Sequence, residues 1–293
     1  MSGFLMQLGG PLQAWGEHSA FTDRDTLAHP TRSGLIGMIA SALGISRAHA
    51  SADTPAAGQL PVGFARLSHL RFVVRCDRMG TRLRDFHTVG GGYPVHRTVP
   101  TAKGTRRAAG FTTIVSERTY LADAVFTIAV TAPGDPDLAA ACARALSAPH
   151  WPLHLGRRSC PPNPQLLLRS DVPDPVTELT RVPLARPAPR TRPDTSAGPP
   201  HEPATVSVRF TADTPLPPDL VPNLSNRSST TTLNDDPVRL HVHDRVYRSR
   251  PAYAARYPLP ATLCHGYGLD YLQALVTYLH PGNSPAPHET STP

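Results

Sequence analysis

The stretch from His29 to Ile45 constrains the fold more than any other part of the chain. After a proline, Thr31 or Ser33 can cap the start of a helix. Apolar side chains then recur at helical spacing: Leu35, Ile36, Ile39, Ala40 and Leu43. Gly44 is the residue type that ends a helix. The sequence therefore predicts one buried helix over residues 31–44.

The first turn of this helix has groups that can bind an anion. It carries free backbone amides and the cation Arg32, followed by the small residues Ser33 and Gly34. Amides and a guanidinium in this arrangement bind a phosphate or the carbonyls of another chain. The P-loop pattern is absent, so an ordinary capped core helix is the alternative interpretation.

Positive charge is concentrated in one segment. Residues 61–120 hold ten arginines and Lys103 against Asp77, Asp85 and Glu117, a local excess of +8 within a total formal charge of +7. The rest of the chain is therefore close to neutral. Such a segment suits a polyanion such as nucleic acid, because neutralised phosphates release counterions. A solvated charged face is the alternative.

Cysteine and histidine spacing predicts neither a metal site nor a cofactor. The four cysteines lie far apart without a C-x-x-C pair: Cys76, Cys142, Cys160 and Cys264. His241, His243 and Asp244 lack a further ligand nearby. Neither a signal peptide nor an apolar run of membrane length is present, so we expect a cytoplasmic protein without membrane contact.

The order of elements predicts an α+β fold. We expect strands at Phe4–Leu8, Leu70–Cys76, Arg82–Val89, Tyr120–Thr131 and Leu153–Arg157, and helices at 31–44 and Asp135–Leu146. The residues Asp77–Gly80 predict the turn of a hairpin between the second and third strands. This is the β-α-β-β-α-β order of a ferredoxin-like, RNA-recognition-type domain over residues 1–182.

A basic excursion interrupts this domain between Gly90 and Ser116. Its cations are Arg97, Lys103, Arg106 and Arg107, and five glycines surround them. It is too long for an ordinary hairpin turn, and such loops are usually functional or disordered.

The C-terminal part differs in composition. Eleven prolines between Pro183 and Pro222 predict a linker or insertion over 183–235, without regular ladders. Alternation over 236–260 predicts a strand that returns to the domain edge. Residues 261–293 form an extension with one short helix at Tyr267–Leu279 and a polar tail.

Five blocks of sequence carry a family resemblance. They are Gly9–Gly16, Phe21–Thr26, Arg84–Val89, Glu117–Ala124 and Pro152–Pro161. Their order and spacing resemble the CasD family, the RAMP-type subunit of the type I-E CRISPR Cascade complex. The resemblance covers about residues 1–165 and returns weakly at Asp236–Pro260.

The resemblance implies a non-catalytic subunit that grips the 5′ handle of a CRISPR RNA. It also implies that the subunit caps the filament of CasC backbone subunits, docks the large CasA subunit and meets target DNA only indirectly. The excursion would be a thumb-like hairpin beside the RNA. Pro161 ends the last predicted strand, so we expect the guanidinium groups of Arg157 and Arg158 to be exposed at the strand end. The predicted RNA contacts are Arg24, Thr31, Arg32, Ser33, Gly34, His87, Arg97, Lys103, Arg106, Arg107, Arg118, Arg157 and Arg158.

Two other functions stay open at this point. Metal-independent RNA cleavage needs a base, an acid and a cation, and the candidates are His87, Tyr120, Arg118 and His154. A histidine in a half-buried strand is more often structural. The third possibility is an interaction subunit without RNA contact, which leaves the charge localisation unexplained.

Overall fold

The computed structural model describes residues 2–17, 22–51, 62–101, 103–108, 110–189, 204–217, 220, 229–241 and 244–281. The fold is α+β, as predicted, with mostly antiparallel strands. The main sheet contains β1 (Gly3–Gly9), β4 (Arg71–Arg78), β7 (Val125–Thr131), β8 (Leu167–Val172), β9 (Thr205–Ala212), β10 (Ser229–Leu240) and β11 (Arg245–Pro260). The helices are α1 (Arg32–Ala42), α2 (Pro136–Ser147), α3 (Pro175–Glu178) and α4 (Leu269–Leu279).

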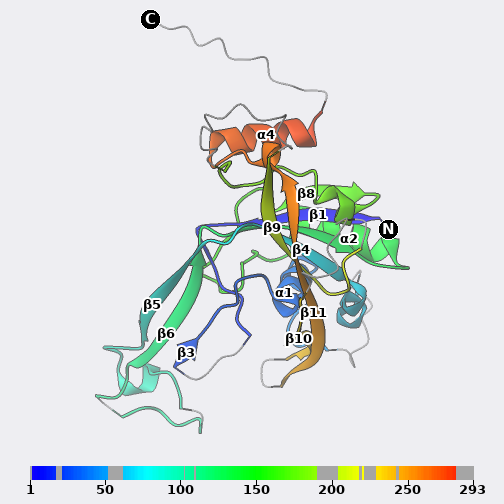
Figure 1. The fold of residues 1–293 in the computed structure, drawn as a ribbon. Helices are drawn as coiled ribbons and strands as arrows, with labels where there is room; N and C mark the ends of the chain where they lie inside the picture. Colours follow the sequence, from blue (N-terminus) through cyan, green and yellow to red (C-terminus); the bar gives the residue numbers. More distant parts are fainter. Residues whose placement is uncertain are drawn as a thin grey trace, which may run out of the picture.

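The strands of the main sheet lie in the order β10-β11-β9-β4-β7-β1-β8 (Figure 1). All neighbouring pairs are antiparallel. Along the chain, α1 follows β1 and α2 follows β7, and β8 then returns beside β1. The C-terminal strands β9, β11 and β10 extend the sheet on the other side of β4.

Both faces of this sheet are covered. Phe4, Met6 and Leu8 of β1 pack in one apolar cluster with α1 and α2. Leu5 points to the opposite face and belongs to a second cluster that contains Tyr271 of α4. Because side chains alternate along a strand, the sheet is the middle layer of the molecule. Figure 1 shows α4 on the opposite side of the sheet from α1.

The predicted first strand and both predicted helices of the N-terminal half are confirmed. Thr31 caps α1, since its Oγ1 accepts a bond from the Gly34 amide at 3.2 Å. Gly44 follows the helix with φ 77°, a left-handed conformation that glycine adopts without strain. Asp135 caps α2 and accepts a bond from the Leu138 amide at 3.1 Å.

The hairpin expected between 70–76 and 82–89 is wrong. Both segments are strands, but they belong to different sheets. β4 pairs with β7 in the main sheet, whereas β5 (Thr81–Val89) pairs with β6 (Ile114–Ala122). One long antiparallel ribbon therefore runs through both sheets, with β4 and β5 on one side and β6 and β7 on the other.

The ribbon bends at two facing positions. Gly80 has φ 70°, and a Cβ there would lie 2.4 Å from the carbonyl oxygen of Ala122. Only glycine allows this close approach. Asp123 opposite has φ 57°, and it divides the single strand expected over Tyr120–Thr131 into β6 and β7.

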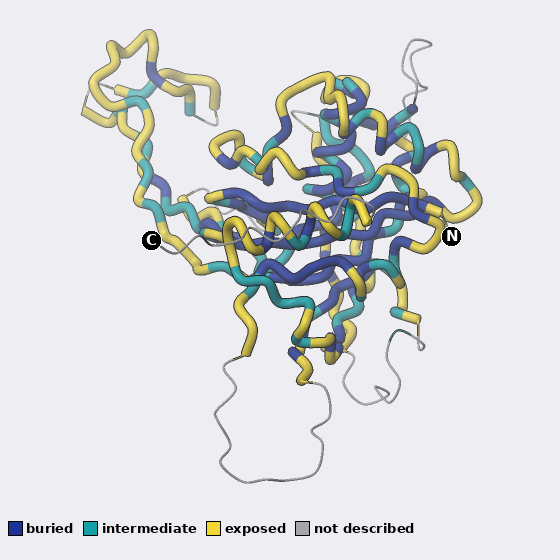
Figure 2. The backbone as a smooth tube through the Cα atoms, turned by 90° about the horizontal axis from the view of Figure 1, so that it is seen from above, coloured by how far each residue is buried: buried dark blue, intermediate teal, exposed yellow. Residues whose placement is uncertain are grey.

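Beyond the bend, the ribbon leaves the main sheet. We call residues Thr81–Ala122 the β5–β6 arm. Figure 2 shows it as a largely exposed projection beside the buried strands of the main sheet. Near its base, β6 also pairs with the short strands β2 (Leu12–Gln13) and β3 (Asp23–Arg24).

The predicted closing strand at Leu153–Arg157 is wrong. This segment is irregular, and it turns at Gly156, where a Cβ would lie 1.7 Å from the Ala14 carbonyl oxygen. The fourth strand of the N-terminal half is β8 instead. Prolines at 152, 161, 162 and 164 cannot donate to a ladder, and β8 occupies the proline-free run after them.

The linker or insertion expected over 183–235 contains regular strand structure, so the expectation that it lacks ladders is wrong. It contains β9, which lies between β11 and β4 inside the main sheet. Proline density misled the prediction because β9 lies within a proline-free window from residue 204 to 214. Leu184 and Ala185 within the same segment are buried.

The C-terminal elements return to the main sheet as predicted, although the segment over 236–260 belongs to two strands. β10 forms the sheet edge, and β11 connects it to β9. The predicted helix at Tyr267–Leu279 is confirmed as α4, whose Tyr271 hydroxyl accepts a hydrogen bond from Gln7. The polar tail from residue 282 onward and His243 lie outside the described residues.

Candidate nucleic-acid interface

The β5–β6 arm combines an exposed position with an excess of positive charge. It holds seven basic residues against Asp85 and Glu117. Asp85 contacts the ring of His87 at 3.2 Å, and Glu117 forms an ion pair with Arg84. Within the described residues, the other cations of the arm form no ion pair with a carboxylate. They are Arg82, Arg97, Lys103, Arg106, Arg107 and Arg118.

Apolar and aromatic side chains are exposed beside these cations. Phe86 is 69% exposed and Phe111 77%. The guanidinium of Arg97 lies 5.4 Å from the centre of the Tyr93 ring. Arginines interleaved with accessible rings suit single-stranded nucleic acid, because bases stack on the rings while the cations meet phosphates.

The predicted excursion from Gly90 to Ser116 is the tip of the arm together with the start of β6. The tip contains one turn of 3₁₀-helix, η2 (Val95–Arg97), and Arg106 donates to the Thr98 carbonyl. These contacts fold the tip on itself. Arg97, Lys103 and Arg106 are exposed around it.

Three predicted contacts meet at the base of the arm. β3 pairs with β6 in parallel, and this register places Arg24 opposite Arg118. The Arg157 guanidinium spans the same junction, donating to the carbonyls of Thr119 and Arg24 at 2.9 Å each. It also lies 4.6 Å from the centre of the Tyr120 ring.

Arg157 and Arg158 therefore differ. The expectation that both forks are exposed is wrong for Arg157, which is half-buried and holds β3 against β6 through backbone carbonyls. Arg158 is exposed, and no contact of its side chain is found among the described residues. Arg158 is the better candidate for a phosphate contact.

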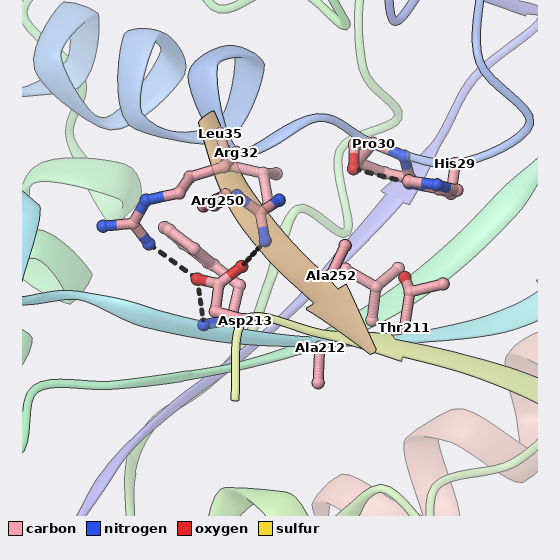
Figure 3. Close-up of a pocket in the computed structure, with 11 residues that line it drawn as sticks. His29, Pro30, Arg32, Leu35, Thr211, Ala212, Asp213, Arg250 and Ala252 are labelled. Atoms are coloured by element: carbon pink, nitrogen blue, oxygen red, sulfur yellow. Dashed lines mark hydrogen bonds and ion pairs between the residues drawn. The ribbon is translucent and has the colours of Figure 1, made fainter. Parts of the chain in front are cut away.

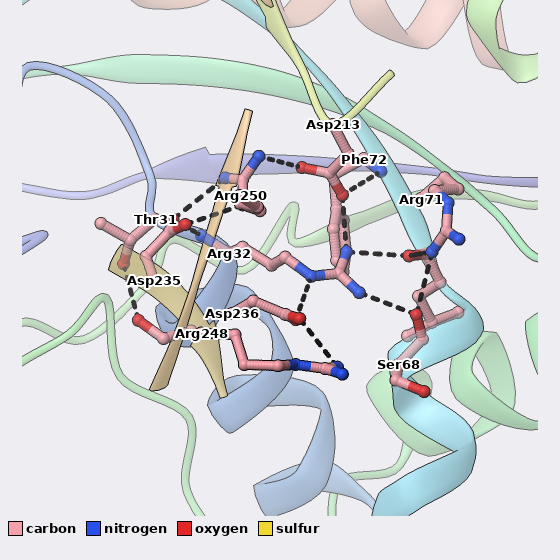
Figure 4. Close-up of polar contacts among 12 residues, drawn as sticks. Thr31, Arg32, Ser68, Arg71, Phe72, Asp213, Asp235, Asp236, Arg248 and Arg250 are labelled. Carbon is pink, nitrogen blue, oxygen red and sulfur yellow. Dashed lines mark hydrogen bonds and ion pairs between the residues drawn. The ribbon is translucent and has the colours of Figure 1, made fainter. Parts of the chain in front are cut away.

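The start of α1 is not an open anion site, contrary to the expectation from its sequence. Arg32 is 4% exposed and is surrounded by carboxylates from the C-terminal part of the chain (Figure 4). Its guanidinium binds Asp213 at 2.6 Å and Asp236 at 2.8 Å, and its backbone amide donates to Asp235 at 2.7 Å. Asp235 therefore binds the amide that a phosphate would need.

The neighbours of Arg32 are also engaged. Thr31 is buried as the helix cap, and Ser33 lies beside the Thr31 hydroxyl at 3.4 Å. A Cβ at Gly34 would lie 2.9 Å from the Trp15 ring, so glycine lets this ring pack against the helix. Thr31 and Arg32 are therefore engaged within the fold, contrary to the expectation that they contact RNA, whereas RNA contact at the half-buried Ser33 and Gly34 stays a prediction.

A second arginine completes the buried charge cluster. Arg250 of β11 binds both Asp213 and Asp235, at 3.0 and 2.7 Å. Beside it lies a small void of about 20 Å³ that His29 also lines, enough for about one water molecule (Figure 3). Burial raises the pKa of the Asp213 carboxyl and lowers the pKa of His29.

Two of the candidate catalytic residues, His87 and Tyr120, lie too far apart to act on one phosphate. His87 of β5 pairs with Ser116 of β6, and Ser116 lies four residues before Tyr120 on β6. At the rise of a β-strand this is about 13 Å, too far for an acid and a base to serve one reacting group. Tyr120 is buried, and His154 is half-buried with its Nδ1 unbonded among the described residues.

Within the described ranges, no cluster of three potential metal ligands is found. In the same part of the chain, none of the helices is long and apolar enough to cross a membrane.

The sequence does not predict a role for Asp213, Asp235, Asp236 or Arg250. The first three lie in or beside the proline-rich region, for which the proline density predicts no contacts with the core. The adjacent carboxylates Asp235 and Asp236 were the available signal, since two acids in a returning strand need nearby cations if they are buried.

Comparison with known proteins agrees with this architecture. Residues 3–253 match the sequence model of the family described as CRISPR-associated protein (Cas_Cas5). The chain belongs to this Cas5 family. The resemblance predicted from the five sequence blocks is thereby confirmed.

Individual relatives extend the comparison. The CRISPR system Cascade subunit CasD of Escherichia coli (strain K12) is 34% identical over 166 residues, which cover 54% of this Cas5-family chain and 66% of CasD, just under two thirds. A chain in a solved CRISPR RNA-guided surveillance complex is 45% identical, with a TM-score of 0.75, and the match covers 94% of this chain and 99% of that one. A crystal structure of a Cas protein, 23% identical with a TM-score of 0.52, covers 92% and 99% and shows a shared fold alone.

Proposed function

We propose that this chain is a non-catalytic, CRISPR-RNA-binding subunit of a type I-E Cascade complex, which holds the 5′ handle of the RNA. The observation that carries this proposal is the β5–β6 arm. Five of its seven cations are exposed, and within the described residues six of the seven form no ion pair with a carboxylate. Similarity to CasD and to a chain of a CRISPR RNA-guided surveillance complex supports the same function.

The arrangement of the N-terminal half supports a RAMP-type domain. Its four strands follow the spatial order β4-β7-β1-β8, with α1 after the first strand in the chain and α2 after the third. This is the antiparallel order of a ferredoxin-like domain. On this assignment the arm is a thumb that extends the two strands β4 and β7, and β9, β11 and β10 are an addition to the domain.

The arm and its base divide the RNA contact between them. Arg97, Lys103 and Arg106 at the tip would neutralise phosphates, whereas Arg24, Arg118 and Arg158 would do so near the main sheet. CasC backbone subunits and the large CasA subunit would cover further surface of the chain, and target DNA would be met through the RNA. The assembly would function in the cytoplasm.

A retention and cleavage assay tests the proposal directly. Labelled repeat RNA is incubated with the purified full-length chain in EDTA, and binding and integrity are followed on the same gel across a salt series. We expect retention without cleavage, and a log–log salt slope of about 0.7 for each phosphate contact. Cleavage that His87→Ala abolishes would establish the endoribonuclease alternative. Neither binding nor cleavage would leave a purely structural subunit.

A further inference from the structure

A groove separate from the predicted RNA contacts opens where β4 bends into the arm. Its volume is about 570 Å³, within the range of pockets that bind small molecules. The lining includes Arg78 and Met79 at the bend, Arg186, Val206 and Ser207 beside it, and Tyr267 just before α4.

Three distant parts of the sequence build this groove and hold it in shape. The segment around Leu184 runs along the segment before α4, where the Leu184 amide donates to the Leu263 carbonyl at 2.7 Å and the Gly266 amide to the Arg186 carbonyl at 2.9 Å. Arg186 Nε in turn donates to the Asp77 carbonyl at 2.7 Å. The walls are therefore tied to the bend by hydrogen bonds.

The chemistry of the lining suits a planar, anionic ligand. Tyr267 is 53% exposed, and the Arg78 guanidinium lies 4.4 Å from the centre of its ring. The Nε atom of Arg78 is buried and lacks a hydrogen-bond partner among the described residues. Asp77 does not neutralise Arg78, because its carboxylate is fully buried and bound to Arg75 at 2.6 Å.

We propose that this groove binds one unpaired nucleotide, with the base stacked near Tyr267 and Met79 and the phosphate at Arg78. Aromatic rings and arginine together provide the stacking and the charge that a nucleotide needs. The groove lies at the base of the arm, so the nucleotide belongs to the RNA bound there. This source rests on the proposed function, whereas a free nucleotide would present the same chemistry.

The test compares variants of the full-length chain that differ only at the groove. Tyr267→Ala and Arg78→Gln remove the ring and the cation, and Tyr267→Phe restores the ring alone. Leu269→Ala is the matched control, because Leu269 is 75% exposed two residues away and does not line the groove. Melting curves verify that each variant is folded.

Two measurements test whether RNA occupies the groove. The first is the affinity for repeat RNA at fixed salt, and the second is crosslinking of 4-thiouridine-labelled RNA, mapped by mass spectrometry. We expect Tyr267→Ala and Arg78→Gln to weaken binding about tenfold and to remove crosslinks at residues 265–268. Tyr267→Phe should regain those crosslinks, and Leu269→Ala should match the unchanged chain.

The outcomes separate this inference from the proposed function. Crosslinks confined to the arm, with unchanged affinity in Tyr267→Ala and Arg78→Gln, would overturn the groove inference and leave RNA binding in place. No RNA binding by the unchanged chain would remove the proposed function. In that case the groove inference is tested by titrating the chain with adenosine and uridine monophosphates. Binding that depends on Tyr267 supports the inference, and no binding overturns it. Protection of Tyr267 by neighbouring subunits without RNA would assign the groove to a protein segment and overturn the inference.

Discussion

The start of α1 and the β5–β6 arm are both rich in arginine, but they use it in opposite ways. At the start of α1, Arg32 and Arg250 are buried against Asp213, Asp235 and Asp236. On the arm, five of the seven cations are exposed, and the arm itself carries two carboxylates, Asp85 and Glu117. The first region joins distant segments of the chain, and the second is available to a partner.

Whether a charged side chain is available to a partner depends on its neighbours in space. A buried guanidinium without its carboxylates would be very costly, so the Arg32 cluster is stable only as a complete set. Exposed arginines cost little and contribute little to folding, which leaves them for phosphate binding. Four predictions test this division.

Arg32→Ala should destabilise the fold by about 3 kcal/mol, because it removes a buried guanidinium and leaves Asp213 paired with Arg250 alone and Asp236 with Arg248 alone. Urea unfolding followed by circular dichroism measures this loss. The fraction that remains folded should still bind repeat RNA. A variant with wild-type stability and no RNA affinity would reverse the assignment of the two regions.

Replacing Arg97, Lys103 and Arg106 together by alanine should have the opposite profile. We expect stability to change by no more than about 0.5 kcal/mol per site, since all three side chains are exposed. The salt slope of RNA binding should fall by about 2, at about 0.7 for each lost phosphate contact. An unchanged slope would show that the tip does not contact the RNA backbone.

Arg157→Ala and Arg158→Ala should separate within one pair of adjacent residues. Arg157→Ala removes bonds to the Thr119 and Arg24 carbonyls and should cost about 1–3 kcal/mol of stability. Arg158→Ala should keep the wild-type melting temperature and weaken RNA binding. Thermal melts and RNA-binding curves of both variants distinguish the two residues. Equal melting temperatures would show that the hydrogen bonds of Arg157 to the backbone carbonyls do not stabilise the fold.

The smallest effect concerns pH at the start of α1. Burial lowers the pKa of His29, and Arg209 and Arg250 lower it further, while Asp235 and the Pro30 carbonyl oppose the shift. The folded state therefore favours the neutral ring. The stability from this group is present above the ordinary pKa of about 6.5 and is lost as the pH falls toward the lowered value.

We expect unfolding free energies measured between pH 7 and pH 5 to fall by about 1 kcal/mol or less from this group. His29→Gln stays neutral and should remove that part of the pH dependence. The same decline in both proteins would assign it to other groups.

The sequence predicted well where local signals decide structure. The cap at Thr31, the stop at Gly44 and the cap at Asp135 are each set within a few residues, and the corresponding helices are confirmed. The basic segment was also visible, because the net charge of a segment does not depend on how it folds. The family resemblance followed from blocks of sequence and is confirmed as well.

The sequence alone did not reveal which segments lie side by side. The bend at Gly80 could be read as a hairpin turn, since both use glycine with positive φ, and only the pairing of β5 with β6 distinguishes them. Likewise, Arg32 sits at a helix start that could receive a phosphate, until β10 brings Asp235 to its amide. Local sequence determined the helices, the caps and the placement of charge along the chain. Which arginines remain exposed follows from the three-dimensional packing, because burial and ion pairing join residues about two hundred positions apart.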